Sequence, residues 1–550
     1  MTMEEKRPLQ SQDQETNLPH HNPSKSPLKK WHIITFIALA VLLFHQPWKR
    51  FSCHHKHHHK HHNKDVKYPG EHISWKYCDT NDGIDLECST LQVPLDHFNN
   101  TSPSKTFTLP LIRIRGQNAS QNILVNPGGP GGSGTEFIYR LGKRLKDSVG
   151  EDFHILSFDP RGVNGSQPAA LCYPDGETRK ARSQLCATDP IRDSVESYAW
   201  SQNIGRACRE TMGEHGLYIN TPQTAADMNS ILDAVGQQDM YYWGFSYGTL
   251  LGQTYATMFP ERAKRVIIDG VADVFDWYNE LISLTAFDDS EHALAGFFDE
   301  CIKAGDACAL SSFADTATSL QDKVMSAVEK LAKDPISVYV DNHTFGILDY
   351  TTMLWSIFRV LHKPGQQWYT LASNLAHLLR GNATAAFLAY KEQSWFASEM
   401  EEHAMTIQFN DAKSGAEYWP QRKEELLEAF APYVNQSLFG SFALGGYYPQ
   451  AAWRIPKTHA FRTRQSVDTK LLVLSTTYDP VTPLTSARVA RRTFQGSRIV
   501  EVKGYGHCSL AVESDCARDK VRAFLKHGSL PDEDVKCDVN SDFSYFQKPT

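Results

Sequence analysis

A serine stands between two glycines in Gly244-Phe-Ser-Tyr-Gly248, directly after an aromatic run and directly before a run of small and apolar residues. The first run, Met240 to Trp243, is typical of a buried strand, and Thr249 to Met258 is typical of a helix. The sequence therefore predicts a strand, a tight turn and a helix, with Ser246 at the apex. Both glycines are needed because a strand and a helix that meet this closely leave no room for a Cβ atom.

Apolar strands and helices alternate through much of the chain, which predicts the α/β class with a mostly parallel sheet. Helical periodicity replaces this alternation from about 272 to 466. We therefore expect a helical cap at 272–466, inserted between two parts of one core at 75–271 and 467–540, with a tail at 541–550. The strands are expected within 91–95, 107–115, 121–125, 153–158, 240–243, 266–270, 470–478 and 497–505.

Three residues with complementary chemistry follow three of these strands. Ser246, Asp479 and His507 occur in the order serine, acid, histidine. Ser246 would attack a carbonyl carbon, His507 would take its proton and return it to the leaving group, and Asp479 would orient the imidazole and stabilise its charged form. The oxyanion would be held by the backbone N–H groups of Tyr247 and Gly129.

Gly129 belongs to a glycine-rich loop, residues 127–134, that follows the strand at 121–125. A phosphate-binding loop would require Gly-Lys-Ser/Thr at its end, and that pattern is missing here. Two prolines stiffen the loop while its glycines allow the backbone N–H groups to approach a ligand. An oxyanion site is therefore the better interpretation.

Six motifs, in order along the chain, resemble the tripeptidyl-aminopeptidase-like α/β-hydrolases, relatives of proline iminopeptidase in peptidase family S33. The resemblance covers about 75–540, with a TAP-like C-terminal region. It implies an α/β-hydrolase fold, a Ser-Asp-His triad, and removal of short units from free peptide N-termini. Asp159 and Arg161 are expected to support the site rather than to take part in chemistry. The motifs are PGGPGGSG at 127–134, FDPRGVNGS at 158–166, GFSYGTLLG at 244–252, VIIDGV at 266–271, YDPVTP at 478–483 and GYGHCS at 504–509.

The cap departs from the family pattern. Two positions where the family often has cysteine are Phe409 and Gln450, which implies one lost disulfide and leaves the cap shape open. Capture of a peptide α-amine requires acidic groups in the cap, although a solvated helix face explains any one acidic residue equally well. The candidates are Glu399, Glu401, Glu402 and Asp411.

The favoured function is a serine aminopeptidase that needs no metal and no cofactor. An esterase acting on a specialised-metabolite substrate uses the same triad, and a non-catalytic binding domain could retain the fold. The substrate is expected to be a peptide or a small acyl compound. A net charge of −7 on 550 residues gives no reason to expect nucleic acid as a partner.

Cysteines and sequons point to the secretory pathway. The eleven cysteines include no paired C-x-x-C zinc pattern and are better read as disulfide partners, with Cys508 and Cys516 among the close pairs. Seven asparagines begin N-x-S/T sequons and are predicted to carry glycans. They are Asn99, Asn100, Asn118, Asn164, Asn342, Asn382 and Asn435.

The N-terminal end predicts membrane attachment. A polar tail at 1–30, expected to be disordered, precedes the apolar run 31–48, which is favoured as a single transmembrane signal anchor. A cleaved signal peptide, giving a secreted protein, and a buried helix are the alternatives. The His-rich stretch at 49–74 is expected to be a solvated spacer rather than a metal site. The catalytic domain would then lie in the lumen or outside the cell.

Overall fold

The structure is a computed structural model that describes residues 65–99, 105–182, 193–279, 285–391 and 399–548. All of them lie in one of the two compact units of the chain, residues 62–550. The predicted tail and apolar run, together with most of the His-rich stretch, lie outside the described residues. Within those residues, none of the helices has both the length and the apolar character that a bilayer crossing requires.

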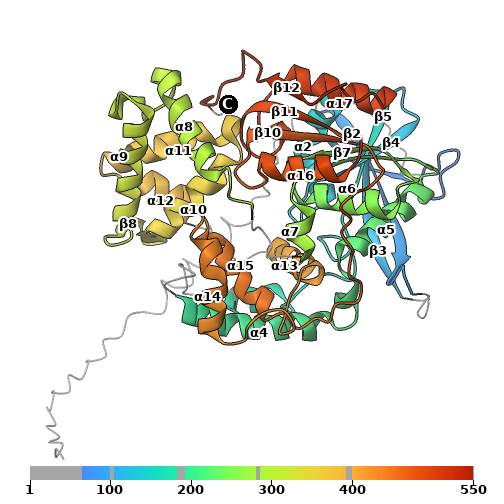
Figure 1. Ribbon diagram of the computed structural model, residues 1–550, viewed down its shortest axis with the longest axis horizontal. Helices are drawn as coiled ribbons and strands as arrows, with labels where there is room; N and C mark the ends of the chain where they lie inside the picture. Colours follow the sequence, from blue (N-terminus) through green and yellow to red (C-terminus); the bar gives the residue numbers. More distant parts are fainter. Residues whose placement is uncertain (1–64, 100–104, 183–192, 280–284, 392–398, 549–550) are drawn as a thin grey trace, which may run out of the picture. The chain divides into compact units, whose positions relative to one another are not determined.

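A ten-stranded sheet forms the centre of this unit (Figure 1). Seven neighbouring strands, from β5 to β12 in spatial order, run parallel, and three antiparallel strands extend one edge. The predicted mostly parallel sheet is therefore confirmed. In spatial order the strands are β1 (Lys76–Asn81), β2 (Ile84–Pro94), β3 (Thr106–Ile114), β5 (Phe153–Phe158), β4 (Gln121–Asn126), β6 (Met240–Phe245), β7 (Ala263–Asp269), β10 (Leu471–Tyr478), β11 (Arg498–Tyr505) and β12 (Val535–Asp538).

Helices cover both faces of the sheet, so the central strands are apolar on both sides. One face packs against α2 (Gly134–Val149) and α17 (Asp515–His527). The other face packs against α5 (Thr221–Ala234), α6 (Tyr247–Met258) and α16 (Leu484–Thr493). This arrangement places the carboxyl ends of the parallel strands at one edge of the sheet, where the predicted site residues follow β6, β10 and β11.

The cap leaves the sheet after β7 and returns at β10. Its first lobe contains α8 (Ser290–Ala304), α9 (Ala317–Lys330), α10 (Tyr350–Leu361), α11 (Pro364–Leu379) and α12 (Thr384–Tyr390) around a core of its own. The hairpin of β8 (Ile336–Asp341) and β9 (Thr344–Leu348) belongs to this lobe. We did not predict it, because its exposed aromatic residues lie within a segment of otherwise helical periodicity.

The second lobe combines cap helices with a helix from the first core segment (Figure 1). It contains α13 (Glu399–Asp411), α14 (Lys423–Val434) and α15 (Ser441–Ala451), and α4 (Ser194–Met212) packs against α15. The approach is close: a Cβ atom on Gly205 of α4 would lie 2.5 Å from the carbonyl oxygen of Ala452. Predicting the whole of 75–271 as core therefore missed that α4 belongs spatially to the cap.

Four disulfide bonds stabilise the described chain. They join Cys78 to Cys88, Cys172 to Cys208, Cys301 to Cys308, and Cys516 to Cys537. The pairing of Cys508 with Cys516 suggested by their spacing is wrong, since Cys508 is a buried free thiol. Cys537 on β12 reaches α17 instead, because β12 pairs with β11 beside that helix. Cys53 and Cys186 lie outside the described residues.

Candidate active site

Ser246 lies at the junction of β6 and α6, with φ 56° and ψ −126°. A Cβ atom on Gly244 would lie 2.3 Å from the carbonyl oxygen of Gly248, and one on Gly248 would lie 2.8 Å from that of Asn126. Neither separation is possible for a real side chain. The predicted strand, turn and helix are confirmed, and both glycines are there for the predicted steric reason.

Asp479 and His507 lie together at the ends of β10 and β11. Both carboxylate oxygens of Asp479 are 3.0 Å from Nδ1 of His507. The backbone N–H groups of Thr482 and Cys508 also donate to this carboxylate, at 2.9 Å each. Asp479 is completely buried, so these bonds fix its orientation and that of the imidazole.

The environment of Asp479 keeps it charged. Burial raises the pKa of its carboxyl. The neighbouring His507 and the hydrogen bonds from His507, Cys508 and Thr482 together lower this pKa by more than burial raises it. The net pKa lies below the ordinary value, so the carboxylate is ionised at neutral pH. An ionised acid at Nδ1 holds the proton on that nitrogen and leaves Nε2 free to accept one.

Thr482 adds a third oxygen beside the imidazole, with Oγ1 at 3.1 Å from Nδ1 of His507. Within the described chain, the hydroxyl of Ser246 makes no hydrogen bond to the His507 ring. Cys508 follows His507 in the chain, and its thiol contacts the backbone of Ser246. A hydrogen bond between a nucleophilic hydroxyl and its base is often long without substrate and shortens when the substrate binds.

The glycine-rich loop lies directly against the serine. A Cβ atom on Gly128, where φ is +87°, would lie 2.7 Å from the Cβ of Ser246 and 2.9 Å from the nitrogen of Tyr247. Gly129 and Tyr247 both line the cavity at Ser246. Tyr247 begins α6, so its N–H has no partner in the preceding turn of helix. The two residues predicted as oxyanion donors therefore line the same cavity as Ser246.

The cavity at Ser246 has a volume of about 100 Å³, with Tyr247, Trp277 and Thr482 in its wall. Its acidic residues are Asp273 and Asp276, and among its described lining residues there is no lysine, arginine or histidine. Burial raises the pKa of Asp273, whose carboxylate accepts hydrogen bonds from the N–H groups of Phe275 and Asp276. The described wall therefore offers a ligand two carboxyl groups and no basic side chain.

Asp269 is a site residue that we did not predict, although it lies in the predicted strand VIIDG and ends β7. Its carbonyl accepts a hydrogen bond from the N–H of Ser246 at 3.0 Å. Its buried carboxylate accepts from the N–H and the hydroxyl of Ser509 and from the indole of Trp243. Burial raises the pKa of this carboxyl to about 6. A carboxylate at the end of a central strand was the signal available in the sequence.

His362 also escaped prediction, because it comes from the cap. Its carbonyl accepts a hydrogen bond from the N–H of His507 at 2.9 Å, and the two rings meet edge to face at 5.6 Å. Burial and the neighbouring His507 lower the pKa of His362 to about 4, so it is neutral at neutral pH. The end of α10 therefore contacts the predicted base directly.

The acidic cap residues have other partners than the predicted peptide amine. Asp411 accepts from the N–H and hydroxyl of Thr221 and from the indole of Trp277. It is buried and is not part of the cavity wall, so it does not fit the predicted substrate contact. Glu401 lines a separate small pocket with Tyr173 and Met405. The Glu399 side chain lies outside the described residues.

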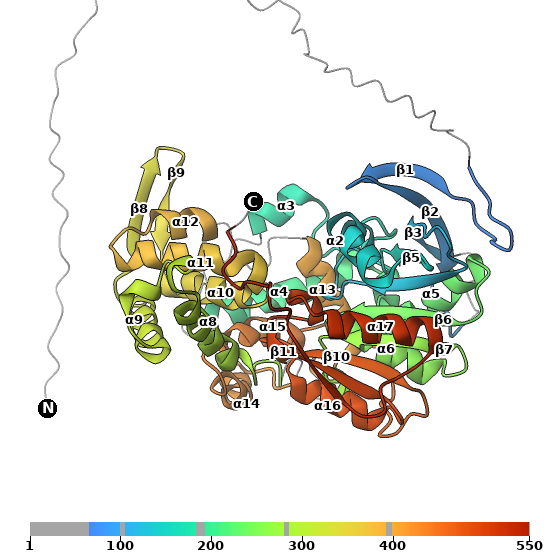
Figure 2. The same ribbon diagram turned by 90° about the horizontal axis from the view of Figure 1, so that it is seen from above.

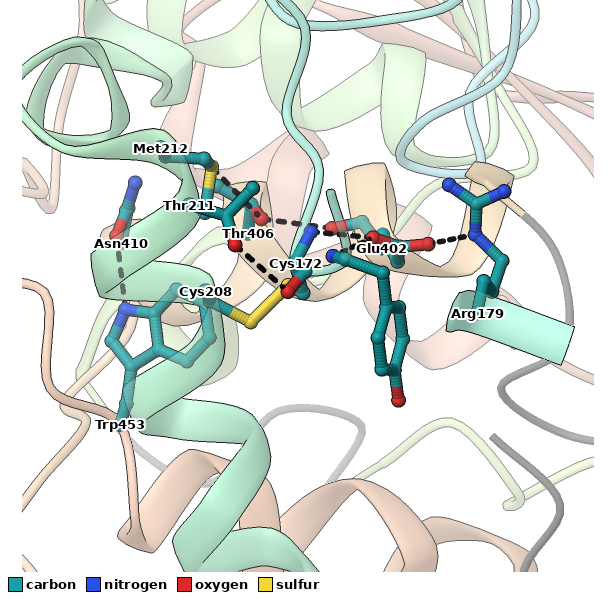
Figure 3. The surroundings of a disulfide bond; sticks show 10 residues. Cys172, Arg179, Cys208, Thr211, Met212, Glu402, Thr406, Asn410 and Trp453 are labelled. Atoms are coloured by element: carbon teal, nitrogen blue, oxygen red, sulfur yellow. Dashed lines mark hydrogen bonds and ion pairs between the residues drawn. A yellow bond between two sulfur atoms is a disulfide. The ribbon is translucent and has the colours of Figure 1, made fainter. Parts of the chain in front are cut away.

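Glu402 stabilises the cap around a disulfide bond (Figure 3). Its carboxylate accepts from the guanidinium of Arg179 and from the backbone N–H of Cys172, which is bonded to Cys208. Thr406, one turn further along α13, donates to the carbonyl of Glu402 at 2.8 Å. Glu402 is 2% exposed, so it bonds α13 to Cys172 and Arg179 and does not face a substrate.

Asp159 and Arg161 have supporting contacts. Asp159 accepts from the hydroxyl of Ser133 at 2.7 Å and from the N–H of Thr135 at 3.0 Å, which fixes the end of the glycine-rich loop. Arg161 is buried and donates to both carboxylate oxygens of Asp227. Neither residue lines the cavity at Ser246.

Potential metal ligands also meet at this edge of the sheet. In the described chain, Asp479, His507 and Cys508 bring one ligand atom each within 4.8 Å of one another. However, Nδ1 of His507 is already bonded to Asp479, and burial raises the pKa of the Cys508 thiol, which keeps it protonated. A metal would require the thiolate and a free ring nitrogen, so these residues fit a hydrogen-bonded pair better.

Comparisons with known proteins agree with this geometry. Residues 121–293 match the family described as alpha/beta hydrolase fold, and residues 436–537 match the family described as TAP-like protein. Serine protease Hip1 of Mycobacterium tuberculosis is 27% identical over 493 residues, covering 85% of this chain and 91% of that protein.

Two further relatives are named for different activities. Tripeptidyl aminopeptidase of Streptomyces lividans is 24% identical over 493 residues, covering 84% of this chain and 86% of that protein. Carboxylesterase B of Mycobacterium tuberculosis is 26% identical over 486 residues, covering 84% of this chain and 89% of that protein. The chain belongs to the TAP-like α/β-hydrolases and is a serine hydrolase.

Proposed function

We propose that this hydrolase is an aminopeptidase in which Ser246 is the nucleophile, His507 the general base and Asp479 the acid that orients it. The observation that carries the proposal is the pairing of His507 with a buried, ionised Asp479 beside the turn that presents Ser246. Attack on a peptide carbonyl would give a tetrahedral intermediate, with its oxyanion at the N–H groups of Gly129 and Tyr247. The amine leaves with the proton returned by His507, and water then hydrolyses the acyl-enzyme.

The acidic cavity wall supports a substrate with a free amine. Asp273 and Asp276 line the same cavity as Ser246. A charged ammonium group would be attracted to these carboxylates, whereas a blocked, uncharged N-terminus would not. These two residues replace Glu399 and Asp411 as our candidates for amine recognition. Four disulfide bonds support a luminal or extracellular catalytic domain, since disulfides persist in oxidising compartments.

A panel of chromogenic substrates tests the proposal. Peptides with free and with acetylated N-termini are compared with simple esters, on wild type and on Ser246→Ala. We expect cleavage of the free peptides, loss of cleavage on acetylation, and no turnover by the variant. Equal rates on both kinds of peptide would remove the aminopeptidase assignment.

An esterase is the second candidate, favoured by the similarity to carboxylesterase B. It predicts turnover of the esters alone. A fluorophosphonate probe separates both enzymes from a binding domain, because labelling that depends on Ser246 requires an activated hydroxyl. Absence of such labelling would reject both enzymatic assignments.

A further inference from the structure

The hairpin β8–β9 has one buried and one exposed face, and it projects from the cap beside α12 (Figure 2). Val338 and Leu348 are buried against the lobe, and a Cβ atom on Gly346 would lie 2.9 Å from the ring of Phe387. Through this face the hairpin packs against α12.

The opposite face is apolar and uncovered. Tyr339 is 71% exposed, Phe345 63% and Ile347 59%. Tyr339 lies directly across the two strands from Phe345, and their rings are stacked at 6.3 Å. Grouped apolar side chains of this size on the surface of a soluble domain mark a contact site or cause aggregation. Something of matching chemistry is therefore expected to cover them.

The turn of the same hairpin supplies a candidate. Asn342 and His343 form the turn, and Asn342-His343-Thr344 is a sequon with an exposed asparagine. Tyr339 and Phe345 are each three residues from Asn342, about 10 Å of extended strand. A glycan on Asn342 is thus tethered at the edge of the aromatic pair, and the C–H faces of sugars pack on the electron-rich faces of such rings.

We propose that Asn342 carries an N-linked glycan whose sugars lie against Tyr339 and Phe345 and keep this face of the hairpin soluble. The four disulfide bonds indicate passage through the compartment in which such glycans are attached. A bulky, hydrated oligosaccharide suits an apolar face at a turn. Asp341, exposed beside the turn, makes an anionic membrane an unfavourable occupant.

Production of the whole chain in a eukaryotic secretory host allows the test. Glycopeptide mass spectrometry identifies modified asparagines, and binding of a hydrophobic dye together with light scattering reports the exposed face. The variant is Asn342→Gln, and the control is Asn382→Gln, which removes another exposed sequon of the same lobe. We expect Asn342 to be occupied, and its variant alone to show a several-fold rise in dye binding and self-association.

A second substitution makes the role of the rings explicit. Replacing Tyr339 and Phe345 by serine in the Asn342→Gln variant should return dye binding and scattering to the wild-type level. An unmodified Asn342 overturns the proposal, and so does an Asn342→Gln variant that behaves like the control. Dimerisation of the glycosylated wild type through this face, or its binding to anionic vesicles, would show that the face is open and would also overturn it.

Discussion

The carboxylate of Asp269 accepts two hydrogen bonds from Ser509, one from its backbone N–H and one from its hydroxyl, both at 2.6 Å. The carbonyl of Asp269 also accepts the N–H of Ser246. Asp269 lies on β7, between the strand that precedes Ser246 and the strand that precedes Asp479. One residue therefore connects the turn of the nucleophile to the loop that carries His507.

Replacing Asp269 by asparagine should lower kcat by about 10- to 100-fold with little change in KM, because a displaced imidazole reacts slowly while the cavity stays intact. The pKa of about 6 gives the direction of the pH effect. As pH falls through 6, protonation removes an acceptor from Ser509, so the wild-type kcat should decline there. The variant lacks that titration, and its profile should be flatter in this range.

Rates between about pH 5 and 8 would check this behaviour. Ser509→Ala serves as the partner variant, since it removes the hydroxyl donor and keeps the backbone N–H. It should reproduce part of the loss at pH 8. A kcat and pH profile of Asp269→Asn that match wild type would show that the connection has no role in positioning His507.

Replacing Asp479 by asparagine should lower kcat by about 10⁴-fold, because the amide no longer holds the proton on Nδ1 or stabilises the imidazolium. Fluorophosphonate labelling should slow with it, while circular dichroism stays unchanged. Asp288→Asn is the control for loss of a carboxylate charge, since Asp288 is exposed and bonds to Thr485 rather than to His507. Comparable activity of the two variants would contradict the proposed role of Asp479.

Gly128→Ala should abolish activity, because the new Cβ would collide with the carbonyl of Phe245 at 2.3 Å and with the Cβ of Ser246. The comparison is Gly150→Ala, at a similar positive φ of +81° but with open space around it. The control carries only backbone strain, of about 1–3 kcal/mol, and should keep its kcat. Thermal unfolding and kcat separate the two effects, and an active Gly128 variant would refute the predicted close approach.

Asp273→Asn tests recognition of the amine. Asp273 accepts hydrogen bonds from the N–H groups of Phe275 and Asp276 at the start of a short helix. Asparagine caps a helix as well as aspartate does, so folding should be retained while the charge is lost. We expect KM for free-amine peptides to rise about 10-fold and KM for esters to stay constant. Since burial raises the pKa of Asp273, the wild-type KM for the peptides should also rise as pH falls. A parallel change for both substrate types would speak against a charge contact.

Glu402→Gln should destabilise the protein by about 3–5 kcal/mol, since it removes the charge of a buried carboxylate that bonds to the buried guanidinium of Arg179. Urea unfolding measures the loss. Glu424, an exposed residue at the start of α14, is the control, and its glutamine variant should unfold like wild type. Equal unfolding midpoints for both variants would mean that the contact in Figure 3 does not contribute to stability.

Local patterns in the sequence predicted the sheet and the positions that follow its strands. Ser246, Asp479 and His507 could be placed because each follows an apolar strand, and parallel strands bring their carboxyl ends to one edge. Asp411 and Glu402 were candidates for amine binding because the sequence shows that a carboxylate is present but not what it bonds to. Their partners, Thr221 and Arg179, are about 190 and 220 positions away. Contacts at such distances follow from packing, which also decided the position of α4 and the partner of Cys516.

The cap begins and ends between two strands that are hydrogen-bonded neighbours. Val266 on β7 pairs with Leu471 on β10, so residues 270–470 leave and re-enter the sheet at one point. Insertions or deletions between those residues leave the order of the strands untouched. Evolution can therefore remodel access to the serine while the reacting groups stay in register, so relatives with the same chemistry are free to differ in what they accept.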